Sequence, residues 1–282
     1  MRISLAQLDS RLGDVEGNFK AAEQAVARAV SESADLIVFP EMFLSGYPIA
    51  DGDEDLAIKH DDPRLAELSR AAGQTGVLIG FAESEPRGSR VFNSVGYFEG
   101  GRLVHLHRKL FLVAYGPYDE RNRFSPGQTL RSFPIHRDRR AAVLCCNDAW
   151  QPQLGFVATQ DGADVVIVPA ASAQSLFPDR YDNYEYWHAI TTFYGRMYQV
   201  FVVFVNRVGG QGPFDYWGGS HAVDPWGNVI AEAPPREESL LTVDIDLVDV
   251  RRRRRQVPLV REARLGLLQR EIARLIDEGG DL

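Results

Sequence analysis

The sequence predicts an α/β protein, because apolar strand-like segments alternate with amphipathic helical segments in two places. Residues 2–8 alternate as a strand, residues 15–30 repeat apolar side chains at helical spacing, and residues 34–40 form a second apolar strand. The same order recurs at 141–144, 154–160 and 164–170. Strand, helix, strand is the parallel βαβ unit, in which functional side chains gather at the carboxyl ends of the strands.

The length and composition fit one large domain. The chain has 282 residues, of which 45% are hydrophobic and 25% charged, and we find no linker or repeat. A net charge of -8 argues against general binding of nucleic acid. No apolar run reaches the roughly 18 residues of a membrane span, and the N-terminus enters a strand pattern without the layout of a signal peptide. We expect a cytoplasmic protein that binds neither nucleic acid nor membranes.

The remaining segments read as strands and helices joined by turns. We expect a helix at 65–72, strands at 77–82, 91–98 and 103–107, an aromatic-rich helix at 182–198, and strands at 200–206, 216–223, 227–231 and 240–245. Glu99-Gly-Gly101 is typical of a hairpin turn. From about residue 247 to 282 the chain reads as a tail with an amphipathic helix near 261–276, and the five arginines at 251–255 fit a solvated helix face.

Two adjacent thiols, Cys145 and Cys146, end the buried strand at 141–144. Pro152 suits the first turn of a following helix, whose free N–H groups would favour a thiolate or an oxyanion. A free cysteine also packs as a small hydrophobe, so this segment alone leaves an inert buried thiol open. Adjacent cysteines cannot join distant segments, which fits a reducing compartment.

Two further charged residues follow strands. Glu41 comes directly after residues 34–40 in an apolar frame that disfavours its charged form, which suits a general base, although an exposed helix-cap glutamate is the alternative. Lys109 follows the predicted hairpin. Only three of the 31 basic residues are lysines, namely Lys20, Lys59 and Lys109, and only Lys109 is bracketed by strand-like and aromatic residues. We therefore expect a role for Lys109 that arginine would not fill.

In chain order, a glutamate, a lysine and a cysteine supply a base, a cationic oxyanion stabiliser and a nucleophile. The six histidines include no HExxH or comparable ligand set, so we predict no metal, and the chemistry needs no cofactor.

Several short motifs occur together with these residues, and their order and spacing are specific. They are Phe39-Pro-Glu41, Gly46-Tyr-Pro48, His107-Arg-Lys109-Leu, Tyr115-Gly-Pro-Tyr-Asp-Glu120, Cys146-Asn-Asp-Ala-Trp-Gln-Pro152, Val205-Asn-Arg-Val-Gly209, Gly219-Ser220 and Asp224-Pro-Trp-Gly227. On these motifs the chain resembles the nitrilase superfamily of carbon-nitrogen hydrolases over nearly its whole length. The resemblance implies a single domain over residues 1–282, folded as a four-layer α-β-β-α sandwich.

The resemblance also implies a role for each site residue. Glu41 is the general base, Lys109 holds the developing oxyanion and Cys146 is the nucleophile. Glu120 matches a second glutamate that lies near the lysine, and the backbone N–H of Asn147 is the other oxyanion donor. Cys146 rather than Cys145 is expected to react, because counting from it places Asp, Trp and Pro at the family's positions +2, +4 and +6. The period of two in a strand also directs neighbouring side chains to opposite faces.

The branch of the family remains open between three possibilities. Asp148 stands where true nitrilases usually have glutamate, so the chain looks more like the amidases, the carbamoylases, or the glutaminase domain of glutamine-dependent NAD synthetase. We expect no second, ATP-using domain of the kind that the synthetase has. Pro169-Ala-Ala-Ser172 and Arg196-Met-Tyr-Gln199 depart from common family patterns, so contacts to the substrate are expected to differ.

We expect hydrolysis of a small carboxamide or N-carbamoyl amine through a cysteine thioester. The predicted substrate-binding residues are Tyr47, Tyr115, Trp150, Ser172 and Phe177, which suggest apolar walls with a few hydroxyls. The acidic residues 51–55 would suit a cationic substrate or simply form a solvated loop. The apolar face of the tail predicts a homodimer or a larger homo-oligomer. The alternatives are a free-standing glutaminase and a catalytically idle interaction module, which would be expected to have lost one of the three catalytic residues.

Overall fold

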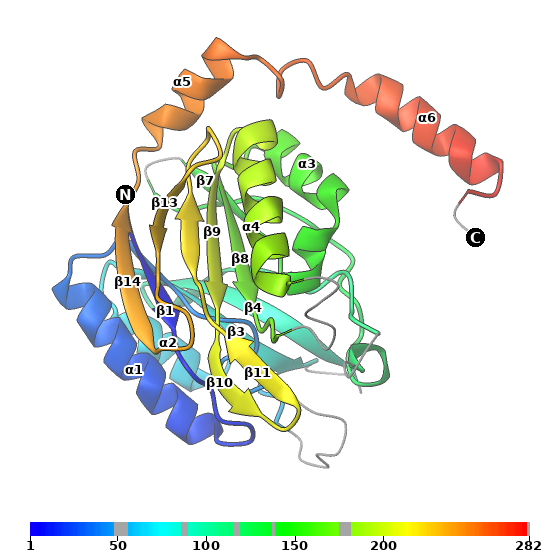
Figure 1. The fold of residues 1–282 in the computed structure, drawn as a ribbon. Helices are drawn as coiled ribbons and strands as arrows, with labels where there is room; N and C mark the ends of the chain where they lie inside the picture. The colour runs from blue at the N-terminus through cyan, green and yellow to red at the C-terminus, as the bar shows by residue number, and fades with distance from the viewer. Residues whose placement is uncertain (48–55, 86–89, 115–118, 137–138, 175–181, 281–282) are drawn as a thin grey trace.

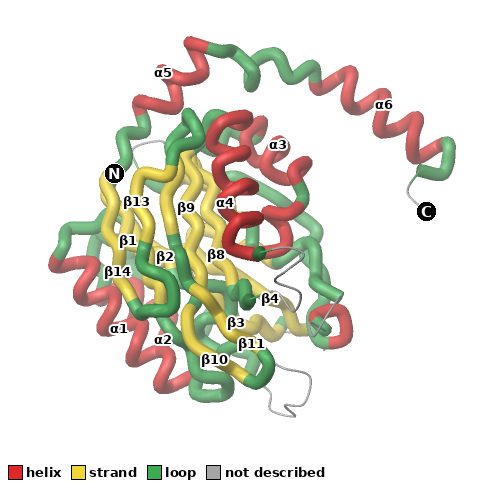
Figure 2. The backbone as a smooth tube through the Cα atoms, in the orientation of Figure 1, coloured by secondary structure: helices red, strands yellow, loops and turns green. Residues whose placement is uncertain are grey.

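The structure, a computed structural model, describes residues 1–47, 56–85, 90–114, 119–136, 139–174 and 182–280. Two six-stranded sheets form its centre (Figure 1; Figure 2). The first contains, in spatial order, β14 (Ser239–Asp244), β1 (Arg2–Gln7), β2 (Leu36–Val38), β3 (Gly76–Ser84), β4 (Val91–Glu99) and β5 (Arg102–Arg108). The second contains β13 (Val229–Glu232), β12 (His221–Val223), β9 (Phe201–Asn206), β8 (Val165–Ala170), β7 (Arg140–Val143) and β6 (Phe133–Pro134).

Helices cover the outer face of each sheet (Figure 1). The first sheet carries α1 (Val15–Ser31) and α2 (Pro63–Ala71), and the second carries α3 (Pro152–Gln160) and α4 (Asn183–Phe193). β1, β2 and β3 run parallel, as do β7, β8 and β9, so each sheet contains the predicted βαβ unit. The four-layer α-β-β-α sandwich is therefore confirmed, in a single domain.

The alternation of side chains along the strands divides the apolar residues between two kinds of core. Residues of one parity pack between the sheets, and among them are Ile3, Leu5, Leu36, Val38, Val143, Val165, Ile167 and Val203. Residues of the other parity, such as Ile37 in β2 and Val166 in β8, face the helices. Because each buried aliphatic side chain contributes about 1.5–3 kcal/mol, the inter-sheet core strongly fixes how the two sheets lie against each other.

One predicted strand is wrong. Residues 216–223 do not form a single strand, because Gly218 and Gly219 turn the chain with φ of +71° and +61°, a region that glycine adopts without steric cost. The first part belongs to β11 (Phe214–Trp217), which pairs with β10 (Val208–Gln211) in a separate hairpin, and the second part is β12. The sequence does not predict β10 or the two-residue β6, since neither is long enough to show alternation.

The tail contains two helices, α5 (Val248–Gln256) and α6 (Leu265–Asp277). α5 contacts the body, since Val250 is buried and a guanidinium nitrogen of Arg254 donates to the Ala163 carbonyl at 2.9 Å. α6 has no buried residue and extends away from both sheets (Figure 1). Within the described ranges, no helix has the length and apolar character that crossing a bilayer requires.

Candidate active site

Three charged or nucleophilic side chains meet at one edge of the sandwich, although they come from both sheets. Glu41 follows β2 and Lys109 follows β5 in the first sheet, whereas Cys146 lies three residues after β7 in the second. Glu41 and Lys109 are both buried, and Cys146 is partly buried on the wall of a pocket. The fold therefore brings together the three residues predicted from strand ends.

Lys109 lies between two carboxylates. Its Nζ donates to Oε1 of Glu41 at 2.7 Å and to Oε1 of Glu120 at 2.8 Å. Burial would lower the pKa of Lys109, but the charges of Glu120 and Glu41 outweigh it and hold that pKa well above its ordinary value. The site therefore contains a permanent ammonium at neutral pH.

Both carboxylates have further donors that fix their orientation. Glu41 accepts from Nδ2 of Asn93 at 2.7 Å and, through Oε2, from the backbone N–H of Ala171 at 2.9 Å. Glu120 accepts from the Tyr47 hydroxyl at 2.8 Å and from the Val113 N–H at 2.6 Å. Hydrogen bonds of this kind favour the ionised form of a buried carboxyl group, so they oppose the cost of its burial.

The two thiols point to different sides, as the strand period predicts. Cys145 packs in the core between the sheets, and its Sγ lies 3.8 Å from Oδ1 of Asn93. Cys146 lines the pocket together with Glu41, whose charge acts on its thiol. Its φ of +46° places it in the left-handed region, which is costly for a residue with a side chain and occurs mainly where the surrounding structure imposes it.

The structure does not favour the thiolate expected at a helix N-terminus, while the alternative expected there, an oxyanion site, stays a prediction. Burial raises the pKa of the Cys146 thiol well above its usual value, and the charge of Glu41 raises it further, while Lys109 acts in the opposite direction. A 3₁₀ turn, Cys146–Trp150, also separates the thiol from α3, which begins at Pro152. The thiol therefore keeps its proton until a base removes it, and Glu41 is the carboxylate that lines the pocket with it.

Asp148 connects the segment that follows Lys109 to the turn that contains Cys146. Its buried carboxylate accepts from the N–H groups of Leu110 at 3.0 Å, Phe111 at 2.8 Å and Cys145 at 3.1 Å, and it lies 2.8 Å from Nε2 of His107. The contacts with His107, Leu110 and Phe111 join the segment that carries Lys109 to the one that carries Cys146, and the contact with Cys145 lies within the latter. The sequence indicates Asp148 only as a marker of the branch, and its structural role could not be seen without the fold.

A cavity of about 300 Å³ opens beside these residues, and its wall includes, among the described residues, Glu41, Tyr47, Val113, Cys146, Asn147, Trp150, Ala171, Ser172, Asn183, Tyr186 and Trp187. The wall includes the predicted residues Tyr47, Trp150, Ser172 and Asn147. The predicted residues Tyr115 and Phe177 lie outside the described residues. The size suits a small molecule better than a polymer.

The sequence does not single out the aromatic side of this wall, which comes from the start of α4. The rings of Tyr186 and Trp150 stack at a centroid distance of 5.7 Å, and Trp187 meets Trp150 edge-on at 5.8 Å. The indole N–H of Trp187 donates to Oγ of Ser172 at 2.9 Å. The aromatic-rich pattern at 182–198 indicates the helix, but only the fold shows that its first turn faces the cysteine.

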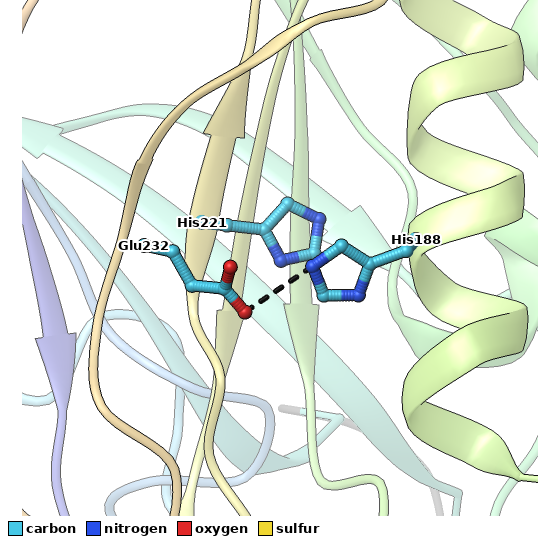
Figure 3. Close-up of side chains that lie close together, drawn as sticks. All are labelled: His188, His221 and Glu232. Atoms are coloured by element: carbon cyan, nitrogen blue, oxygen red, sulfur yellow. Dashed lines mark ion pairs between the residues drawn. The ribbon is translucent and has the colours of Figure 1, made fainter.

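A second group of side chains, His188, His221 and Glu232, lies on α4, β12 and β13 (Figure 3). His188 and Glu232 form an ion pair at 3.2 Å, and the two imidazole rings stack at 4.3 Å. Both nitrogens of His221 already have protein partners, Gly219 O and Thr191 Oγ1, each at 2.8 Å. Burial lowers the pKa of His221 to about 3, so the ring stays neutral. The ligand atoms of the three residues lie within 4.8 Å of one another, but because both nitrogens of His221 have partners, the cluster serves here to join α4 to the second sheet.

Comparison with known proteins agrees with this geometry. Residues 2–255 match the carbon-nitrogen hydrolase family. The chain is 34% identical over 268 residues to a glutamine-dependent NAD(+) synthetase from Thermotoga maritima, covering 90% of this chain and 45% of that protein. It is 33% identical over 272 residues to an (R)-stereoselective amidase from Pseudomonas sp., covering 95% and 93%. The chain thus spans less than half the length of this synthetase and nearly all of this amidase.

Solved structures share the fold. A carbon-nitrogen hydrolase from Helicobacter pylori G27 superposes with a TM-score of 0.85 at 19% identity, over 96% of this chain and 98% of that one. A mutant amidase of the nitrilase superfamily from Nesterenkonia AN1 gives a TM-score of 0.81 at 24% identity, over 96% of both chains. Because the family match extends over residues 2–255, the chain belongs to the carbon-nitrogen hydrolase family, and the solved structures agree with its fold.

Proposed function

We propose that this protein hydrolyses the C–N bond of a small carboxamide or N-carbamoyl amine through a thioester on Cys146. One observation carries the proposal: a protonated thiol lies on the wall of a small pocket together with the carboxylate of Glu41, which also holds the ammonium of Lys109 at 2.7 Å. A base and a nucleophile therefore line one space where a carbonyl group can enter, and a cation lies directly beside the base.

The proposed reaction begins when Glu41 takes the proton of the Cys146 thiol and the sulfur attacks the carbonyl carbon. Lys109 and the N–H of Asn147 hold the negative oxygen while the C–S bond forms. The C–N bond then breaks, and the nitrogen leaves as ammonia or an amine with the proton from Glu41. Glu41 next takes a proton from water, whose oxygen displaces the sulfur and releases the acid. That proton returns to Cys146.

Glu120 has a supporting role in this proposal, because it holds Lys109 from the side opposite Glu41. An ammonium shared by two carboxylates keeps its charge and its position through the cycle. An amidase from Nesterenkonia sp. AN1, 25% identical to this chain, takes acrylamide by Michael addition at its active-site cysteine in a mutant form. This precedent supports a reactive cysteine at the corresponding place here.

The described pocket wall favours a neutral amide over glutamine. Among the described lining residues, Glu41 is the single charged side chain, and the others are aromatic, aliphatic or neutral polar groups. The α-carboxylate of glutamine would lose its hydration in this pocket, and no cationic side chain on the described wall would compensate for that cost. The free-standing glutaminase remains the second candidate, because the NAD synthetases are among the similar proteins. An idle interaction module would not need the buried ion pairs of Lys109.

We expect small neutral amides and N-carbamoyl amines to release ammonia with a kcat/KM at least about tenfold above that of glutamine, the factor that roughly 1.4 kcal/mol of lost pairing gives. Nitriles should be poorer still. An ammonia-release screen over aliphatic amides, N-carbamoyl amines, glutamine and nitriles measures this, with Cys146→Ala as the blank. Glutamine as the sole good substrate would favour the glutaminase, and no release from any compound would favour the idle module.

The tail region, residues 247–282, is proposed to lie in a homodimer or larger homo-oligomer interface. One face of α6 exposes Leu265, Leu268, Ile272, Leu275 and Ile276, each between 37% and 56% accessible. Such an apolar stripe is costly to leave in water. We expect light scattering to report at least twice the 31.5 kDa chain mass at micromolar concentration.

Two matched variants test whether that face is responsible. The pair Ile272→Glu and Ile276→Glu should shift the protein toward the monomer, whereas Arg270→Glu, on the opposite face of α6, should leave the assembly intact. A monomeric wild-type protein would rule out the oligomer, and an oligomer that survives the double substitution would place its interface elsewhere.

A further inference from the structure

Asn93 on β4 contacts Glu41, Glu120 and the backbone of Lys109, and it is not among the described residues that line the pocket. The residue is fully buried. Its side-chain Nδ2 donates to Oε1 of Glu41 at 2.7 Å and to Oε1 of Glu120 at 3.2 Å. Its backbone oxygen accepts the N–H of Lys109 at 2.8 Å. The residue lies in no motif that the sequence analysis uses.

The site contains one more negative than positive charge around Lys109, and the side chain of Asn93 can stabilise this arrangement. Glu41 and Glu120 both bind the same ammonium of Lys109, so two negative charges share one positive charge in a buried space. Like charges in a medium of low dielectric disfavour each other's ionised form. A carboxamide carries two N–H donors and no net charge. Asn93 can therefore stabilise both carboxylates without supplying a second cation that would weaken Glu41 as a base.

The orientation of this amide is fixed from its other end. The Cys145 thiol lies 3.8 Å from Oδ1 of Asn93, where it can donate a weak hydrogen bond. A flipped amide would direct its oxygen at Glu41 and Glu120, which have no proton to give when ionised. The thiol beside the nucleophile thus supports the arrangement in which Nδ2 faces the carboxylates.

Other titratable groups also act on Glu41. Lys109 and Glu120 share its hydrogen-bond network, and Cys146 interacts with its charge. Tyr47, Cys145 and Tyr216 interact with its charge from three further segments. Asn93 is the neutral side chain that donates to both carboxylates within the described residues.

We propose that Asn93 is a positioning residue that holds the carboxylates of Glu41 and Glu120 around one ammonium and aims Glu41 at the Cys146 thiol. This inference rests on the proposed function, in which Glu41 accepts the thiol proton. A residue that acts in this way affects proton transfer more than substrate binding. Its loss should lower kcat with little change in KM, and it should move the acid limb of the kcat/KM profile to higher pH.

Asn93→Leu tests this, because leucine fills similar space without a donor. We expect kcat to fall about 10²-fold, at the low end of the effect of general-base catalysis, and the acid limb to move up by about one pH unit. Iodoacetamide should alkylate Cys146 about tenfold more slowly at neutral pH, because a misdirected Glu41 no longer takes the thiol proton during the attack. If leucine prevents folding, Asn93→Ala carries the same measurements.

Ser94→Ala is the matched control. Ser94 is the next residue of β4, is equally buried, and donates to a buried carboxylate, Glu83, outside the site. Loss of the Ser94 hydroxyl should leave the dependence of kcat/KM on pH and the alkylation rate of Cys146 unchanged. The proposal would be overturned if folded Asn93 variants kept the wild-type dependence of kcat/KM on pH and the wild-type alkylation rate. It would also be overturned if Ser94→Ala changed both by as much as the Asn93 variants do. Alkylation needs no substrate, so it reports on Asn93 even if the ammonia screen refutes the proposed reaction.

Discussion

Cys146→Ala abolishes turnover and Cys145→Ala keeps most of it: this is the largest effect that we expect from any substitution in the chain. Cys146 lies on the pocket wall beside Glu41, whereas Cys145 is buried between the sheets and cannot reach a substrate. Removing a nucleophile that acts with its base typically costs on the order of 10⁶ in kcat. Losing the Cys145 thiol removes a weak hydrogen bond and a small apolar group, for which about 1 kcal/mol of stability is a reasonable expectation.

Ammonia release from the best amide of the screen measures both variants, with circular dichroism to show that each is folded. Mass spectrometry of the wild-type protein with a slow substrate adds a direct reading, because the acyl group should be found on a peptide that carries Cys146 and be lost in Cys146→Ala. An active Cys146→Ala together with an inactive Cys145→Ala would reverse the assignment.

Lys109→Met should reduce both activity and stability. In the folded protein Glu41 and Glu120 would then be buried without their shared cation. Removing one partner of a buried ion pair costs about 3–5 kcal/mol, and losing an oxyanion donor lowers kcat by about 10²–10³-fold. Ammonia release and urea unfolding measure the two effects separately.

Lys109→Arg should fail nearly as badly in turnover, although it keeps the charge. A single nitrogen of Lys109 reaches both Oε1 atoms, at 2.7 and 2.8 Å, and a planar guanidinium cannot reproduce that contact in a buried space. Lys20→Arg on α1 is the matched control, since Lys20 is exposed and far from the site in the sequence. Full activity of Lys109→Arg would show that any cation suffices at this position. It would also contradict the expectation, based on the small number of lysines, that arginine cannot replace Lys109.

Local sequence patterns are enough to locate the three candidate catalytic residues, because each of them follows the end of a strand. Glu41 follows β2, Lys109 follows β5 and Cys146 follows β7, so strand alternation alone locates them at the edge of a sheet. The same alternation predicts that the two thiols face different sides. Glu120 has no such position, and only the family resemblance indicates it.

The supporting residues are harder to predict because their partners are distant in the sequence. Asn93 meets Glu41 across 52 positions, and His107 meets Asp148 across 41. Asn93 and His107 lie within strands, where a polar residue is equally compatible with a solvated face. The protonated state of Cys146 is another such property, because it depends on burial and on Glu41 and not on the helix that follows.

The division of the site between the sheets makes the inter-sheet core part of the chemistry. Neither half of the sandwich holds a complete set of groups, since the acid and the ammonium belong to one half and the sulfur to the other. Aliphatic contacts between the sheets, such as those of Val38 and Val143, therefore determine the distance between Glu41 and the Cys146 thiol. In a state where the two sheets shift against each other, the strands and helices would be intact. Glu41 and Cys146 would then no longer be close enough for the proposed reaction.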